Sequence, residues 1–227
     1  MVKRHWVKIG LLVIGLILAM SLLGCVNKPL PEHASKNHDE AAAAGQTILD
    51  EWETITPPPV PELKSFKADA KTALLILDMQ TALCKNPRSI ASIPKIDQLL
   101  SKARGKDILV VYSLLATGKL SDIVPDLAPA MDDPIVESSV DKFYNTDLDK
   151  ILREHNIKTL IITGTAANGA VLNTATGAIL RGYRVVIPIE GMSAENPYAE
   201  QYTAWHMLNS PGTKNSVTLT KISLITF

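Results

Sequence analysis

Four short runs of consecutive apolar residues lie in the last two thirds of the chain. They span residues 73–77, 108–112, 159–163 and 184–189. Because both faces of such a run are apolar, each run fits a strand that is covered on both sides of a sheet. Residues 217–227 predict one or two further strands at the end of the chain.

Segments with helical periodicity separate these runs. Apolar positions recur at helical spacing in residues 93–104, 147–155, 170–181 and 197–208. The alternation predicts a parallel sheet with right-handed crossovers, and hence a three-layer α/β/α domain with a mainly parallel, Rossmann-like sheet over residues 68–227. In such sheets ligands bind outside the carboxyl ends of the strands, so the residues that follow each apolar run are the first candidates for chemistry.

The N-terminus has the layout of a bacterial export signal. Basic residues precede an almost unbroken apolar stretch over residues 9–23. The stretch ends at Leu22-Leu23-Gly24-Cys25, which resembles the lipobox of bacterial lipoproteins. That resemblance implies a signal peptide over residues 1–24, cleavage before Cys25 and lipidation of this cysteine. An uncleaved transmembrane anchor is the alternative.

Both alternatives place the rest of the chain outside the cytoplasm, at a membrane of the cell envelope. Val26 follows the cysteine in place of the aspartate associated with inner-membrane retention, so the outer membrane is expected in a cell with two membranes. Residues 25–67 predict a lipid-anchored tether, because four prolines within residues 57–61 favour an extended spacer. A short helix is expected within residues 39–53, with Trp52 docked on the domain.

Composition excludes two broad classes of protein. The 227 residues include 23 Lys+Arg and 23 Asp+Glu, so a formal net charge of zero gives no electrostatic basis for binding nucleic acid. With 46% hydrophobic residues, disorder of the whole chain is also unexpected. Cys25 and Cys84 indicate neither a disulfide framework nor a zinc site. The expected partners are a small molecule and the membrane, and assembly into a homo-oligomer is left open.

Three features of the sequence are placed where chemistry is expected. Asp78 follows the first apolar run, residues 164–170 form a small-residue loop that opens a helix, and Lys142 precedes the helix near residue 147. Backbone N–H groups at such a helix start can bind an anion. Each feature also has a purely structural interpretation, because a carboxylate at a strand end caps helices or forms ion pairs, and small residues make tight turns.

Together these segments resemble the isochorismatase-like cysteine hydrolase family. The resemblance covers residues 71–210 and rests on ALLILDMQ at residues 73–80, VDKFYNTDL at residues 140–148 and TGTAANGAVLNTA at residues 163–175. It implies an active site of Asp, Lys and Cys, preceded by a non-proline cis peptide in the cysteine loop. Asp78 and Lys142 match the first two residues, and the cysteine position is Ala170. The residues that match the substrate and oxyanion loop are Thr165, Ala166, Asn168 and Gly169.

Alanine at position 170 removes the thiolate with which the family attacks an amide carbonyl. In one hypothesis Asp78 is a general acid positioned by Lys142, as the resemblance implies for members that open the vinyl ether of isochorismate without a cysteine. In another, the chain is an inactive protein that binds a ligand or a partner. An alanine introduced to trap a substrate complex is a third. No cofactor is expected, and residues 112–117 lack the Asp-x-His pair of metal-binding relatives, so no metal is expected.

Overall fold

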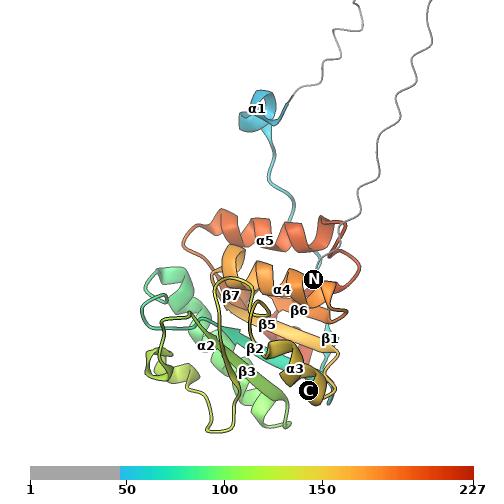
Figure 1. The fold of residues 1–227 in the computed structure, drawn as a ribbon. Helices are drawn as coiled ribbons and strands as arrows, with labels where there is room; N and C mark the ends of the chain where they lie inside the picture. Colours follow the sequence, from blue (N-terminus) through green and yellow to red (C-terminus); the bar gives the residue numbers. More distant parts are fainter. Residues whose placement is uncertain (1–46) are drawn as a thin grey trace, which may run out of the picture. The chain divides into compact units, whose positions relative to one another are not determined.

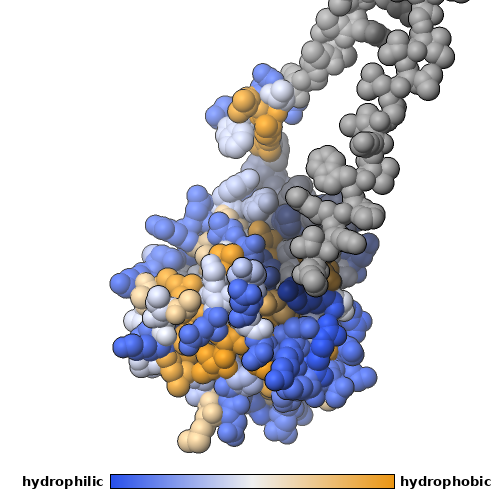
Figure 2. Space-filling view, viewed as in Figure 1, coloured by the Kyte–Doolittle hydropathy of each residue, from blue (hydrophilic) through white to orange (hydrophobic). Residues whose placement is uncertain are grey.

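The computed structural model describes residues 47–227, so the expected signal peptide, Cys25 and most of the expected tether lie outside the described residues. The chain divides between Thr56 and Pro57 into two compact units. In the first unit, α1 (Ile48–Glu51) is followed by a 3₁₀ turn at Trp52–Thr54. Apolar residues are exposed on this unit (Figure 2), and Trp52 is 64% exposed.

A parallel sheet forms the centre of the second unit (Figure 1). Within the described residues it has seven strands in the order β4-β3-β2-β5-β6-β8, with β7 beside the end of β5. All pairs in it are parallel, as the sequence predicts. Its strands are β2 (Thr72–Leu77), β3 (Leu109–Leu114), β4 (Ile135–Glu137), β5 (Thr159–Thr165), β6 (Arg184–Pro188), β7 (Met192–Ser193) and β8 (Val217–Thr220).

Helices cover both faces of this sheet. The helices are α2 (Pro87–Arg104), α3 (Leu148–Glu154), α4 (Leu172–Leu180) and α5 (Pro197–Asn209). Apolar residues of α2 pack with one face of the sheet, and those of α3, α4 and α5 pack with the other. Because β2 and β5 are buried along their whole length, their continuous apolar sequence is explained by cover on both sides. The predicted three-layer α/β fold is confirmed.

Two helices begin at different residues from those that periodicity predicts. The second helix starts at Pro87 instead of residue 93, because the Asn86 side chain accepts hydrogen bonds from Arg88 N and Ser89 N and caps it. The helix expected from residue 170 begins as α4 only at Leu172, since a π-helical turn occupies Ala167–Val171. Such turns are rare and often stand at functional sites.

The last residues of the expected tether belong to the second unit. Leu63 packs on the core, and Lys64 N donates to Leu219 O at 3.0 Å. Strand β1 (Phe66–Lys67) pairs in parallel with β9 (Ile225–Thr226) near the C-terminus. The expected boundary at residue 68 therefore lies inside the compact unit, which starts at Pro57. Across residues 47–227, no helix combines the length and apolar character of a membrane span.

Candidate active site

The ends of the central strands bring the first candidate residue to the carboxyl edge of the sheet. Leu77 at the end of β2 lies in register with Ser113 of β3 on one side and Gly164 of β5 on the other. Asp78 comes next and has a φ of 52°, a left-handed conformation that non-glycine residues seldom adopt. The chain therefore turns sharply at Asp78, and its carboxylate stays at this edge.

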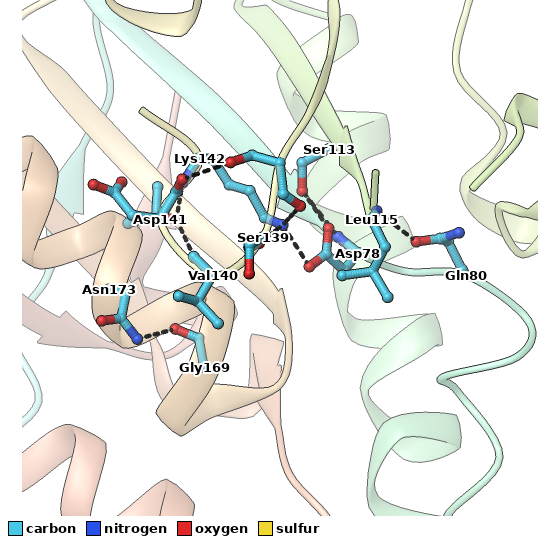
Figure 3. Close-up of polar contacts among 12 residues, drawn as sticks. Asp78, Gln80, Ser113, Leu115, Ser139, Val140, Asp141, Lys142, Gly169 and Asn173 are labelled. Atoms are coloured by element: carbon cyan, nitrogen blue, oxygen red, sulfur yellow. Dashed lines mark hydrogen bonds and ion pairs between the residues drawn. The ribbon is translucent and has the colours of Figure 1, made fainter. Parts of the chain in front are cut away.

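Asp78 and Lys142 form a buried ion pair (Figure 3). Lys142 Nζ lies 2.7 Å from Asp78 Oδ2, and the two side chains are 0% and 4% exposed. Lys142 Nζ also donates to the carbonyl oxygens of Ser138, at 3.1 Å, and Ser139. Because three oxygens surround the ammonium group, Lys142 is held in one place although its side chain is long and flexible.

Ser113 completes the surroundings of the carboxylate. Its hydroxyl donates to Asp78 Oδ1 at 2.7 Å and accepts from Asp78 N at 3.2 Å. Burial raises the pKa of Asp78 above its ordinary value, and the hydrogen bonds from Lys142 and Ser113 lower it back only in part. A carboxyl group with a raised pKa is protonated at a higher pH than usual, which suits a proton donor.

The loop of small residues lies beside Asp78 on the neighbouring strand. Gly164 has a φ of +127°, and a Cβ there would lie 2.1 Å from Leu77 O, so only glycine fits. The Thr165–Ala166 peptide is cis, as the resemblance implies for this loop. Ala166 O accepts from Gly169 N at 3.0 Å and from Val171 N at 3.3 Å, which closes the π-helical turn around Ala170.

The predicted loop residues have different environments. Ala166 and Asn168 are exposed, Gly169 is half-buried, and Ala170 is 3% exposed. Thr165 is buried, and its Oγ1 donates to Ser193 O at 3.2 Å, so its hydroxyl is used to hold β7. Gly169 N and Val171 N already donate to Ala166 O, so only the remaining N–H groups at the start of this turn are suited to an anion.

The π-helical turn and the lysine loop are packed together. Thr174 Oγ1, one helical turn beyond Ala170, accepts from Lys142 N at 3.1 Å and donates to Val140 O at 3.4 Å. Asp78, Lys142 and the Ala170 turn thus form one connected cluster. Sequence reasoning missed Ser113 and Thr174. A polar residue at the end of the apolar run in β3 is the signal that points to Ser113.

Other candidate chemistry is limited in the described residues. Between residues 47 and 227, no three His, Cys, Asp or Glu side chains cluster as metal ligands. Burial raises the pKa of the Cys84 thiol to about 11, and its Sγ lies 3.9 Å from Met79 Sδ. Cys84 is therefore held as a thiol in apolar surroundings and does not replace a thiolate nucleophile.

The sequence matches the model of a known protein family. The family model described as Isochorismatase domain matches residues 72–220. The uncharacterized isochorismatase family protein YaaI of Bacillus subtilis (strain 168) is 29% identical over 168 residues, 73% of this chain and 80% of that protein. The N-carbamoylsarcosine amidase of Arthrobacter sp is 33% identical over 87 residues, 38% of this chain. Those residues are 33% of the amidase, so the chain spans about a third of its length.

Solved structures show the same architecture. An isochorismatase-like hydrolase from Alkaliphilus metalliredigens has a TM-score of 0.60 at 27% identity, covering 67% of this chain and 95% of that one. An N-carbamoylsarcosine amidase from Thermoplasma acidophilum has a TM-score of 0.59 at 21% identity, covering 67% of this chain and 96% of that one. At so low an identity, the second similarity shows the fold alone.

Proposed function

The chain belongs to the isochorismatase family, and from this premise we propose that it hydrolyses a small molecule by acid–base chemistry, without a cysteine nucleophile. The observation that carries the proposal is the buried Asp78 carboxyl, held by Lys142 and Ser113 and given a raised pKa by burial. On the resemblance of residues 163–175 to the family, we assign Ala170 to the cysteine position, where an alanine has no group that can form a covalent intermediate.

A vinyl ether such as that of isochorismate is the substrate class that suits this set of groups. Asp78 donates its proton to the terminal carbon of the vinyl group, and water adds to the carbon that bears the ether oxygen. The added water loses one proton, which restores the acid form of Asp78. Collapse of the resulting hemiketal passes the hydroxyl proton to the ether oxygen, breaks the C–O bond and releases pyruvate and a diol. The Lys142 ammonium group, 2.7 Å from the carboxyl oxygen, stabilises the Asp78 carboxylate that the proton transfer leaves behind.

The pH dependence of isochorismate turnover tests this role of Asp78. As the acid, Asp78 must be protonated, so turnover by the full chain is expected to fall as pH rises through its raised pKa. Ser113→Ala removes a hydrogen bond that favours the ionised carboxylate. The pKa of Asp78 then rises further, and the falling limb of the pH–rate profile moves to higher pH.

The control for that profile is Ser101→Ala, which changes an exposed serine of α2 and leaves the limb in place. If Ser113→Ala leaves the falling limb of the pH–rate profile where it is, or moves it to lower pH, the assignment of Asp78 as the acid is contradicted. Absence of any isochorismate turnover in the wild-type chain removes this substrate.

The alternative is a catalytically inactive protein that binds a ligand or a partner through the old site. Ala170 and the nearly complete burial of both charged side chains favour it. Ala170→Cys tests whether the rest of the site is still competent for amide hydrolysis, because it supplies a thiol at the start of a helix, where the N–H groups favour a thiolate. We expect the variant to hydrolyse members of a panel of small amides that includes N-carbamoylsarcosine and nicotinamide.

Ala167→Cys, on the same turn, is the matched control and is expected to stay inactive, because its side chain is buried at a position that does not align with the nucleophile. Amide hydrolysis that disappears on thiol alkylation indicates that a single substitution removed the chemistry. An inactive Ala170→Cys chain that still folds contradicts the expectation that the rest of the site is competent for amides.

We further propose that the chain is a lipoprotein attached to the extracytoplasmic face of an envelope membrane through Cys25. The basic and apolar residues before Cys25 support this assignment. When the full chain is expressed in a bacterial host with labelled palmitate, the wild type and Cys84→Ala are expected to carry label, whereas Cys25→Ala is not. Membrane retention without label in the wild type contradicts lipidation and supports the uncleaved anchor.

A further inference from the structure

Glu200 on α5 connects three elements beside the candidate site. Its Oε1 accepts from Arg88 Nε of α2 at 2.8 Å, and its Oε2 is hydrogen-bonded to Arg88 Nη2. The same Oε1 accepts from the backbone N–H of Ala194 at 2.9 Å. Ala194 directly follows β7, so this one carboxylate fixes the first residue after that strand.

The contribution of the Arg88–Glu200 ion pair to folding stability is too small to explain why Glu200 makes these contacts. The Arg88 side chain is 43% exposed, and both residues line two surface cavities of about 820 and 620 Å³. An ion pair with one partner this open to water contributes little to stability, although the Glu200 side chain is only 13% exposed. The bidentate contact does set the orientation of the carboxylate, because a guanidinium group binds both of its oxygens in one plane.

Strand β7 needs such support because it is short. It has two residues and two register pairs, Met192 with Gly164 and Ser193 with Thr165. The Ser193 carbonyl accepts from Thr165 Oγ1, while the Ser193 hydroxyl is buried without a hydrogen-bond partner in the described residues. The Ala194 N–H bond to Glu200 is therefore an important constraint on where this strand ends.

Thr165 transmits that constraint to the site. It is the residue before the cis peptide, and Ala166 and the π-helical turn follow it. Hydrogen bonds thus connect Arg88 to Glu200 and Glu200 to Ala194, and the adjacent residue Ser193 is hydrogen-bonded to Thr165. Each contact is within the second unit, and none involves Asp78 or Lys142.

We propose that Glu200 is a positioning residue, which places β7 and through it the Thr165–Ala166 turn that leads into the π-helical turn around Ala170. This inference rests on the proposed function, because kcat reports the position of the turn only if the site catalyses a reaction. The proposal predicts that turnover depends on the Glu200 oxygen that accepts from Ala194 N–H. The negative charge of Glu200 is expected to affect mainly the ion pair with Arg88.

Three variants separate the acceptor from the charge. Glu200→Ala removes both and is expected to lower kcat about tenfold or more with little change in KM, because small displacements of a site cost up to about 100-fold. Glu200→Gln keeps an oxygen for Ala194 N–H and is expected to retain most of kcat. The double variant Arg88→Glu with Glu200→Arg restores opposite charges without an acceptor, so it is expected to recover thermal stability and not kcat.

A merely structural role gives a different result. If the charge-reversed double variant recovers kcat together with thermal stability, the ion pair alone is sufficient and the proposal is overturned. The proposal also fails if Glu200→Ala folds and has the kcat of the wild type. Isochorismate is the substrate in these assays, and each variant is measured as the full chain.

Thiol alkylation tests the positioning role of Glu200 without any turnover, so this proposal can fail or stand independently of the proposed hydrolysis. In the Ala170→Cys background, the rate of alkylation by iodoacetamide reports the thiolate that the turn stabilises, and peptide mass spectrometry separates this thiol from Cys25 and Cys84. Adding Glu200→Ala is expected to slow alkylation several-fold, and adding Glu200→Gln is expected to leave it near its starting rate. If the wild type has no turnover but this difference appears, the proposed function fails and the positioning role stands. If Ala170→Cys is alkylated at the same rate with and without Glu200→Ala, the positioning role is overturned.

Discussion

Replacing Lys142 with methionine is expected to lower the free energy of unfolding by about 3 to 5 kcal/mol. Methionine fills a similar volume, so the loss comes from the charge: the Asp78 carboxylate stays buried without its ammonium partner. The carbonyl oxygens of Ser138 and Ser139 also lose their shared donor. Urea denaturation followed by circular dichroism measures the change, with the exposed Lys102→Met of α2 as a control expected to stay within about 0.5 kcal/mol.

Two comparisons identify the cause of that loss. Adding Asp78→Asn to Lys142→Met removes both charges, so the double variant is expected to lose less stability than the two single losses added together. Burial already raises the pKa of Asp78, so the folded state holds this proton more tightly than the unfolded state, and ionisation of Asp78 on raising the pH costs stability. The unfolding free energy lost in Lys142→Met should therefore become smaller as the pH falls. Strictly additive losses, or a loss unchanged with pH, contradict the ion-pair explanation.

Asp78→Asn is expected to reduce isochorismate turnover about 100- to 10,000-fold, the range that removal of a general acid commonly gives. The amide has nearly the same size as the carboxyl group but cannot give up a proton at neutral pH. Its carbonyl oxygen still accepts the hydrogen bond from the Ser113 hydroxyl, so the polar contact at that side of the group is kept. Initial rates of pyruvate release by the full chain measure the effect.

The asparagine also leaves Lys142 without its counter-charge, so a folding control must accompany the rate. Rates are compared below the temperature at which circular dichroism detects unfolding of the variant. Asp126→Asn changes an exposed aspartate in the 3₁₀ turn at Pro125–Leu127 and is expected to keep the wild-type rate. Turnover by folded Asp78→Asn at a rate close to that of the wild type would exclude Asp78 as the acid.

Sequence patterns located the sheet well because its strands have one simple cause. A strand buried on both faces must be apolar at every position, and residues 73–77 and 159–163 lie within β2 and β5. Helix starts were located less well because local capping determines them. Periodicity does not detect the capping residue Asn86 or the proline after it. These two residues start α2 before its apolar pattern begins. Strand β1 has two residues and is too short to give a sequence pattern of its own, so periodicity does not predict it.

The candidate site was predicted in part for a similar reason. Asp78 and Lys142 were found through a family resemblance, and the structure brings them into contact. Ser113, Thr174 and Glu200 act on that site through hydrogen bonds between residues far apart in the sequence. Such contacts depend on strand register and helix packing, and no spacing in a single sequence specifies them.

The pairing of β1 with β9 sets the order in which the second unit can be completed. Phe66 lies near the start of this unit, and its partner Ile225 follows every strand of the main sheet along the chain. Domains commonly fold from the N-terminal side during synthesis, but this pair must wait until β9 has been made. Until then β1 lacks the partner strand with which it pairs in the structure. Pairing of β1 with β9 therefore reports that the chain has been made at least as far as Thr226.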